Sequence, residues 1–241
     1  MRYSVSFTVT RLVRFLLLFS VFLLIANLIA VYFRRVLHFE NAFGFVALFD
    51  FDNEYNVPSL FSVLLIATNA LLLLLISRHK AVVESGRKYW RIFSYVFFYL
   101  ALDELASIHE QLGHLVYRFS PHLLPTDVSR YWIVPMGILV ALFAVYFFRF
   151  YWQLPGSVKL QFFVAGSIYV LGAVGVELLG ELYMWNHREA GFGYGLLSSL
   201  EEMCEMIGMI LFLRALLLYL QELSKSSGFQ LQFSTGQKQP E

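Results

Sequence analysis

Eight acidic residues lie inside segments that are hydrophobic enough to cross a membrane, and these are the groups best suited to chemistry. The eight are Asp103, Glu104, Glu110, Glu177, Glu181, Glu201, Glu202 and Glu205. One ionised carboxylate near the bilayer midplane costs about 2.5–3.5 kcal/mol on insertion scales. No Lys or Arg lies in the middle of the three segments that carry the acids. Bound cations, protons or water in a cavity must therefore neutralise or solvate these groups.

Helical spacing places most of these acids on one stripe per segment. At about 100° per residue, Glu177 shares a helical face with Glu181, and Glu201 shares one with Glu205. The stripe of the remaining segment is formed by Asp103, Ser107, Glu110 and His114. Counted at about 1.5 Å per residue, all three stripes lie at similar depths in the outer half of the membrane. This agreement predicts a common polar centre.

The two histidines of that remaining segment differ in direction. On an ideal helix His109 points about 100° away from Glu110. His114 is therefore expected to face the centre ahead of His109, although a kink would reverse that order.

Carboxylate and imidazole groups are the usual protein ligands of Fe, Mn and Zn, and a helix bundle can hold a dinuclear site between facing helices. The candidate ligands are Glu110, His114, Glu177, Glu181, Glu201, Glu205 and His109. Asp103 and Glu110 are the candidate catalytic bases, since a free carboxylate can accept a proton from metal-activated water. The paired E-x-x-H, HxxxH and HExxH patterns are absent. The sequence predicts a divalent or trivalent transition-metal site, mononuclear or dinuclear, and leaves the metal open.

Three functions are compatible with such a centre. The first is a metal-dependent enzyme, a hydrolase or an oxidoreductase, that acts on a lipid or another apolar substrate. The second is a proton- or cation-coupled transporter, because ionisable groups inside membrane segments often mark transport pathways. The third is a structural or assembly subunit whose acids are protonated and hydrogen-bonded. Glu104 and Glu202 lie off the main stripes, so single losses there are expected to matter less.

Six apolar segments are long enough to span about 30 Å of hydrocarbon. They lie near residues 12–33, 57–77, 90–118, 131–151, 160–186 and 192–220. We therefore expect an all-α fold, a six-helix transmembrane bundle over residues 1–223 with a disordered cytoplasmic tail at 224–241. The polar site is expected between the third, fifth and sixth segments.

Basic residues predict the orientation of this bundle. Thirteen of the 18 Lys and Arg residues lie at the N-terminus, at the C-terminal side and in two of the loops, namely Arg2, Arg11, Arg14, Arg78, Lys80, Arg87, Lys88, Arg91, Arg149, Lys159, Arg214, Lys225 and Lys238. Cytoplasmic loops carry such an excess, so both termini are expected inside. The four tryptophans fall at segment ends, as an aromatic belt requires: Trp90, Trp132, Trp152 and Trp185.

Composition supports a membrane protein and excludes several soluble classes. Hydrophobic residues make up 59% of the 241 residues, charged residues make up 15%, and the mean hydropathy is +0.64. A net charge of +1 gives no basic surface for nucleic acid. Cys204 is the single cysteine, so an internal disulfide and a zinc ribbon are excluded. The expected partners are membrane lipids and an apolar small molecule, and the oligomeric state stays open.

The first outer loop carries acids at alternate positions, Asp50, Asp52 and Glu54. This spacing is similar to the first half of a calcium-binding loop, but Tyr55 and Phe61 occupy the positions of the required glycine and final acid, so an EF-hand is rejected. The loop has two interpretations: a helix-entry loop with a solvated acidic edge, or a lid or head-group contact above the carboxylates.

Three segments resemble an uncharacterised family of small multipass bacterial membrane proteins. They are Phe49 to Ser62 (FDFDNEYNVPSLFS), Leu100 to Glu110 (LALDELASIHE) and Leu200 to Gly208 (LEEMCEMIG). The resemblance implies a bacterial inner membrane and supplies no activity. A looser similarity to membrane hydrolases and oxidases that hold metal between helices transfers no catalytic residue, because their His-rich motifs are missing here.

Overall fold

The computed structural model describes residues 8–119, 131–187 and 189–227, and this part of the chain is helical without a β-strand. The helices that run along the bundle are α1 (Val9–Arg35), α3 (Val57–Arg78), α4 (Glu84–Ala106), α6 (Ile133–Gln153), α7 (Gly156–Val170), α8 (Glu177–His187) and α9 (Phe192–Ser227). A π-helical turn, Leu171–Val176, joins α7 to α8. The other elements are a 3₁₀ turn (Ala42–Gly44), α2 (Phe45–Phe49) and α5 (Ile108–Phe119).

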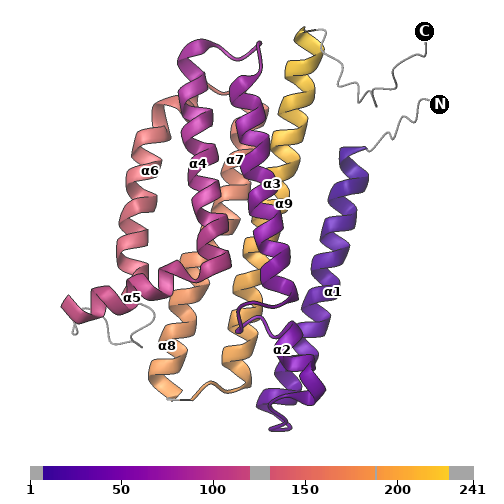
Figure 1. Ribbon diagram of the computed structural model, residues 1–241, viewed down its shortest axis with the longest axis vertical. Helices are drawn as coiled ribbons and strands as arrows, with labels where there is room; N and C mark the ends of the chain where they lie inside the picture. Colours follow the sequence, from indigo (N-terminus) through magenta and orange to yellow (C-terminus); the bar gives the residue numbers. More distant parts are fainter. Residues whose placement is uncertain (1–7, 120–130, 188, 228–241) are drawn as a thin grey trace, which may run out of the picture.

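These helices form one bundle along the long axis of the molecule (Figure 1). Five described helices are long and apolar enough to cross a membrane, with α7 and α8 counted as one, and α4 with α5 forms a sixth if that bent pair is one span. The start of α1 and the end of α9 lie at the same end of the bundle. The predicted all-α fold is confirmed, and the predicted six spans agree with the larger of these two counts. The predicted boundary at residue 223 falls inside α9, and residues 228–241 of the expected tail lie outside the described residues.

The expected continuous helix over residues 90–118 is wrong. The helix breaks at Ser107, which has a left-handed backbone (φ +49°), and the two flanking helices are bent by 89°. Asp103 favours this break because its Oδ1 accepts a hydrogen bond from the backbone N–H of His109 at 2.8 Å. A carboxylate that satisfies a free N–H of the first turn stabilises a new helix start. In consequence α5 runs across the bundle while α4 runs along it.

Helix α9 is the centre of the bundle and packs against α1, α3, α7 and α8. Its buried side chains join a core that includes Ile210 and Leu216, both fully buried. Near the start of α4 this core is aromatic: Trp90 contacts Phe162 with ring centroids 6.0 Å apart, and Phe162 contacts Phe212 at 4.7 Å. The end of the bundle away from Glu104 is therefore tightly filled with apolar rings.

Gly208 allows α9 to approach α7 closely. A Cβ at this position would lie 2.9 Å from the backbone nitrogen of Tyr169 and 3.0 Å from the carbonyl oxygen of Ala165. Gly208→Ala is expected to lower the free energy of unfolding by about 1–3 kcal/mol, because the backbone of α7 must move to admit the methyl group. Thermal unfolding in detergent measures the effect. Gly166→Ala on α7 is the control, since its added Cβ meets nothing within 4 Å; equal melting temperatures for the two variants would contradict the close approach.

Candidate functional site

Five glutamates from three helices interact with one another inside the bundle, and we call them the carboxylate cluster. The cluster consists of Glu104 on α4, Glu177 on α8, and Glu201, Glu202 and Glu205 on α9. Glu201 interacts electrostatically with Glu177. Glu202 interacts electrostatically with Glu104, Glu205 and Glu177, and Glu205 interacts with Glu104 and Glu177. Acids far apart in the sequence therefore share one region.

The π-helical turn positions Glu177 in this cluster. It ends at Val176, directly before Glu177, and such a turn rotates the residues that follow it relative to a regular helix. Gly172 in the same turn permits close contact with α9, because a Cβ there would lie 2.8 Å from the carbonyl oxygen of Glu201. The Glu177 side chain is only 3% exposed as a result. Tyr169, near the end of α7, interacts electrostatically with Glu205.

The helical segments around the cluster supply no cationic side chain. Residues 92–117, 160–187 and 189–213 contain neither Lys nor Arg. Between described residues, Lys and Arg form ion pairs only with Glu40, Asp50, Asp52 and Glu84. Carboxyl groups that interact on segments without Lys or Arg thus call for protons or bound cations.

An imidazole lies beside the cluster at the break between α4 and α5. Nδ1 of His109 is 3.2 Å from Oδ2 of Asp103, and Nε2 of His109 is 3.9 Å from Oε1 of Glu54. Asp103 therefore fixes the ring and directs its second nitrogen toward Glu54. A carboxylate that orients an imidazole in this way is common to general bases and to metal-ligating histidines.

The break reverses the expected order of the two histidines. His109 is partly buried against Asp103, whereas His114 is exposed on α5. The turn at Ser107 separates His114 from the face of α4 that carries Asp103, so a single stripe from Asp103 to His114 does not form. Glu181 is buried one turn beyond Glu177 on α8. The side chain of Glu110 lies outside the part that the structure describes.

Sequence reasoning missed four groups near this site. Glu104 and Glu202, expected to be peripheral, belong to the carboxylate cluster. Tyr169 and Glu54 also lie at the site, because Tyr169 interacts with Glu205 and Glu54 faces His109. A central helix such as α9 buries more than one face, so a narrow stripe underestimates its contribution. The alternating acids of the outer loop were the available signal for Glu54.

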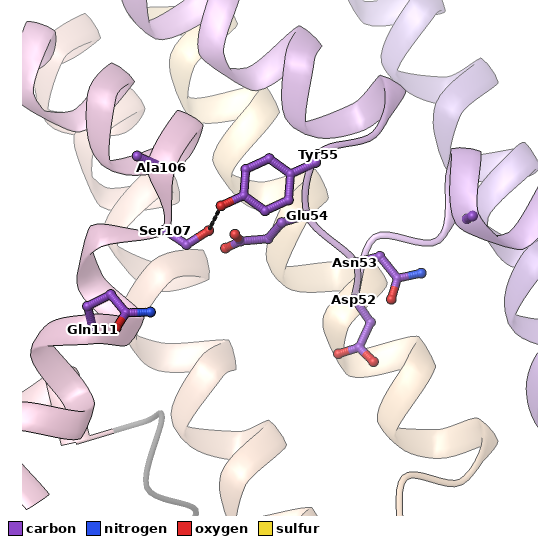
Figure 2. Close-up of a pocket in the computed structure, with 8 residues that line it drawn as sticks. Asp52, Asn53, Glu54, Tyr55, Ala106, Ser107 and Gln111 are labelled. Carbon is purple, nitrogen blue, oxygen red and sulfur yellow. Dashed lines mark hydrogen bonds between the residues drawn. The ribbon is translucent and has the colours of Figure 1, made fainter.

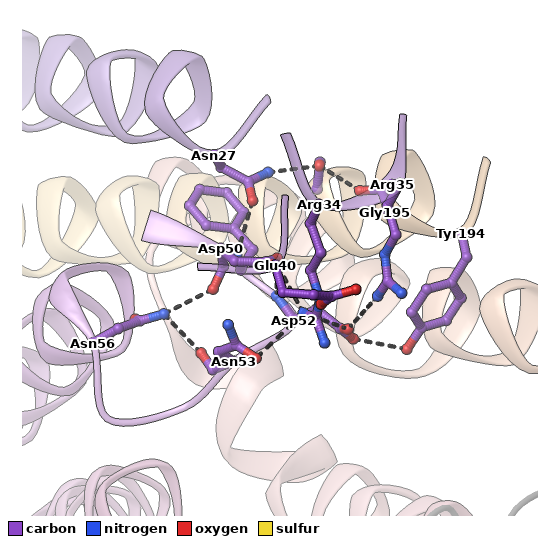
Figure 3. Close-up of polar contacts among 12 residues, drawn as sticks. Asn27, Arg34, Arg35, Glu40, Asp50, Asp52, Asn53, Asn56, Tyr194 and Gly195 are labelled. Atoms are coloured by element: carbon purple, nitrogen blue, oxygen red, sulfur yellow. Dashed lines mark hydrogen bonds and ion pairs between the residues drawn. The ribbon is translucent and has the colours of Figure 1, made fainter. Parts of the chain in front are cut away.

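The acidic loop between α2 and α3, residues 50–56, is held to α1 and α9 by ion pairs and hydrogen bonds (Figure 3). Arg34 contacts Asp50 at 2.7 Å, and Arg35 contacts Asp52 at 2.9 Å. Tyr194 of α9 donates to the other oxygen of Asp52 at 2.9 Å. Burial raises the pKa of Asp52, and the Tyr194 hydrogen bond opposes that rise. The acidic residues of this loop are therefore partly buried, whereas the interpretation as a helix-entry loop expects them to be solvated.

Asparagines fix the backbone of the same loop. Oδ1 of Asn27 accepts from the N–H of Phe51 at 2.8 Å, and its Nδ2 donates to Ser199 at 2.6 Å. Asn56 donates to the carbonyl oxygens of Asp50 and Asn53, and its Oδ1 caps α3. The position of Glu54 is therefore set by a network that joins three helices.

Asp50→Asn is expected to destabilise the protein by about 3 kcal/mol, because it removes the charge partner of Arg34 at a site where Asp50 is only 2% exposed. Glu40→Gln is the matched control: Glu40 also pairs with Arg34, at 3.7 Å, but its side chain is 78% exposed. Its loss is expected to cost at most about 1 kcal/mol. Thermal unfolding followed by tryptophan fluorescence compares the two, and equal costs would refute a structural role for the buried pair.

A bundle of five to six long apolar helices with acids in its interior defines a helical multipass membrane protein. The chain belongs to the family described as a domain of unknown function (DUF8692), whose model matches residues 15–220. This agrees with the resemblance to an uncharacterised family. No curated protein and no solved structure matches the chain. Among the described residues, no group of three or more His, Cys, Asp or Glu side chains is placed to hold a metal ion.

Proposed function

We propose that the protein is a membrane enzyme that uses a transition metal, held by the carboxylate cluster, to act on a lipid or another apolar substrate. The observation that carries this proposal is the meeting of five glutamates from α4, α8 and α9 on segments without Lys or Arg. One cation with two or three charges would offset several carboxylates and satisfy their lone pairs together.

The residues beside the cluster have defined roles in this proposal. The ligands are expected among Glu110, Glu177, Glu181, Glu201 and Glu205, with His109 in place of the exposed His114. The metal would supply activation of water or dioxygen. His109, oriented by Asp103, is then available as a general base or as a ligand.

Elemental analysis tests the proposal. Protein purified in detergent without chelator is expected to contain at least one Fe, Mn or Zn ion per chain. Its melting temperature should fall after chelation and recover when the metal is restored, since a ligand bound only to the folded state stabilises it. Metal-free protein with a melting temperature indifferent to added Fe, Mn and Zn would overturn the enzyme proposal. A structural subunit with protonated acids would then be the better description.

A proton- or cation-coupled transporter is the second candidate, favoured by the interaction of Glu201 on α9 with Glu177 on α8. Neighbouring carboxyl groups without a Lys or Arg partner are suited to taking up and releasing protons or cations. The aromatic contacts of Trp90, Phe162 and Phe212 argue against a continuous polar path to the far end of the bundle. Proteoliposomes loaded with a pH-sensitive dye separate the two functions, because a transporter moves protons or cations and an enzyme does not.

We further infer that the chain lies in a bacterial inner membrane with both termini in the cytoplasm. The asymmetry of 13 against five basic residues supports this orientation. Both described chain ends lie at the same end of the bundle, which is compatible with it. Reporter fusions after residues 45, 84, 125, 156, 189 and 230 are expected to alternate between periplasmic and cytoplasmic signals. A loop that fails to alternate would contradict six spans.

A further inference from the structure

A polar cavity of about 550 Å³ lies between the first outer loop and the break that separates α4 from α5 (Figure 2). We call it the head-group cavity. Its lining residues are Ala47, Asp52, Asn53, Glu54, Tyr55, Ala106, Ser107 and Gln111. Six of these eight side chains carry hydrogen-bonding groups, and no Lys or Arg is among them.

Two strained residues close one side of this cavity. Tyr55 (φ +59°) and Ser107 (φ +49°) both have left-handed backbones, and their hydroxyl oxygens are 3.2 Å apart. Such conformations cost about 1–3 kcal/mol each for residues other than glycine and persist where the surroundings impose them. Here the ion pair of Arg34 with Asp50 and the hydrogen bonds of Asn56 hold the loop. The cavity wall is thus built before any ligand binds, as in most small-molecule sites.

The lining chemistry favours a cationic hydrogen-bond donor. Glu54 and Asp52 supply carboxylates, while Asn53 and Gln111 supply amide oxygens. One oxygen of Asp52 is engaged by Arg35 and the other by Tyr194, whereas Oε1 of Glu54 lies 3.9 Å from Nε2 of His109. An ammonium group can donate to several such acceptors at once, whereas a phosphate or carboxylate would meet like charge.

Helix α5 gives the ligand a second, apolar part. It leaves α4 at 89°, so it runs across the bundle at the level of the cavity, to which it contributes Gln111. Its Leu115 is 52% exposed and its Phe119 is 78% exposed. A helix that lies across a membrane bundle with exposed apolar side chains fits the interfacial region, where head groups and acyl chains meet. An amphiphile could place its head in the cavity and its chain along α5.

We propose that the head-group cavity binds the ammonium group of an amphiphilic substrate, an inference that rests on the proposed function. Glu54 links the two sites, because it lines the cavity and faces Nε2 of His109 at 3.9 Å. A head group bound there lies beside the imidazole that Asp103 orients. The substrate bond next to the head group is therefore the one expected to react.

Native mass spectrometry of the detergent-purified full chain tests the cavity with three probes: phosphatidylethanolamine, phosphatidylglycerol of the same acyl chains, and ethanolamine alone. Phosphatidylethanolamine is expected to bind at least about tenfold more tightly than phosphatidylglycerol, the ratio that one charged hydrogen bond supplies. Equal binding of the two lipids would overturn the ammonium preference. Ethanolamine binding as tightly as the lipid would overturn the amphiphile.

Variants locate the binding. Glu54→Gln and Gln111→Ala are each expected to weaken phosphatidylethanolamine binding, the first by at least about tenfold, while Glu40→Gln in the same loop is expected to leave it unchanged. Unaltered binding in both cavity variants refutes the proposal. Metal content is measured on the same samples. Selective lipid binding by metal-free protein would uphold the cavity and remove the proposed enzyme, so the two failures are distinguishable.

Discussion

Glu177→Gln and Glu205→Gln are expected to reduce the metal content of the purified protein to below about a tenth of the wild-type value. Gln keeps the shape of Glu but loses the negative charge and one strong oxygen ligand, and divalent cations select carboxylates over amides. Glu177 is buried and interacts with Glu201, while Glu205 interacts with Glu104 and Glu177. Elemental analysis of chelator-free preparations gives the measurement.

The control for this experiment lies on α9, the helix that carries Glu205. Glu222 is exposed near the far end of α9, so Glu222→Gln is expected to retain the full metal content and melting temperature. If Glu177→Gln and Glu205→Gln keep the wild-type metal content, or raise the melting temperature of a metal-free protein, then these groups are protonated acids in the native state.

The interior position of the acids could be predicted from the sequence because lipid imposes a large penalty on exposed charge. Glu177, Glu201 and Glu205 had to face other helices for that reason alone, whatever the details of packing. The same penalty applied equally to Glu104 and Glu202. Their position off a narrow stripe predicts a peripheral place for them. That criterion fails for a helix such as α9, which has neighbours on several sides.

The break at Ser107 could not be predicted from helical periodicity. It contains neither glycine nor proline, and one of its partners is distant in the sequence: Tyr55 approaches the Ser107 hydroxyl, while the nearby Asp103 caps the new helix. Periodicity assumes that every residue keeps the same backbone angles, so one left-handed residue invalidates it for all that follow. For this reason His109, and not the predicted His114, lies beside Asp103.

Asp103→Asn and His109→Ala are each expected to lower turnover by about 10²–10⁴-fold, the range that general acid–base groups contribute. Asn at position 103 can still accept the backbone N–H of His109 and so preserve the start of α5. Its amide nitrogen, however, presents a donor to the imidazole in place of an acceptor, which favours the opposite tautomer of His109. The Asp103→Asn variant therefore separates orientation of the ring from stability of the fold.

Two measurements follow this pair of variants. Conversion of lipids from a total bacterial extract, followed by mass spectrometry, gives turnover, and ¹⁵N spectra of histidine-labelled protein report the tautomer of His109 without any substrate. His114→Ala is the matched control, because it removes the same side chain from the exposed face of α5. Wild-type turnover in His114→Ala, together with a changed tautomer and lost turnover in Asp103→Asn, would place the reactive imidazole at the helix break. Equal losses from the two histidine variants would mean that α5 acts only through its structure.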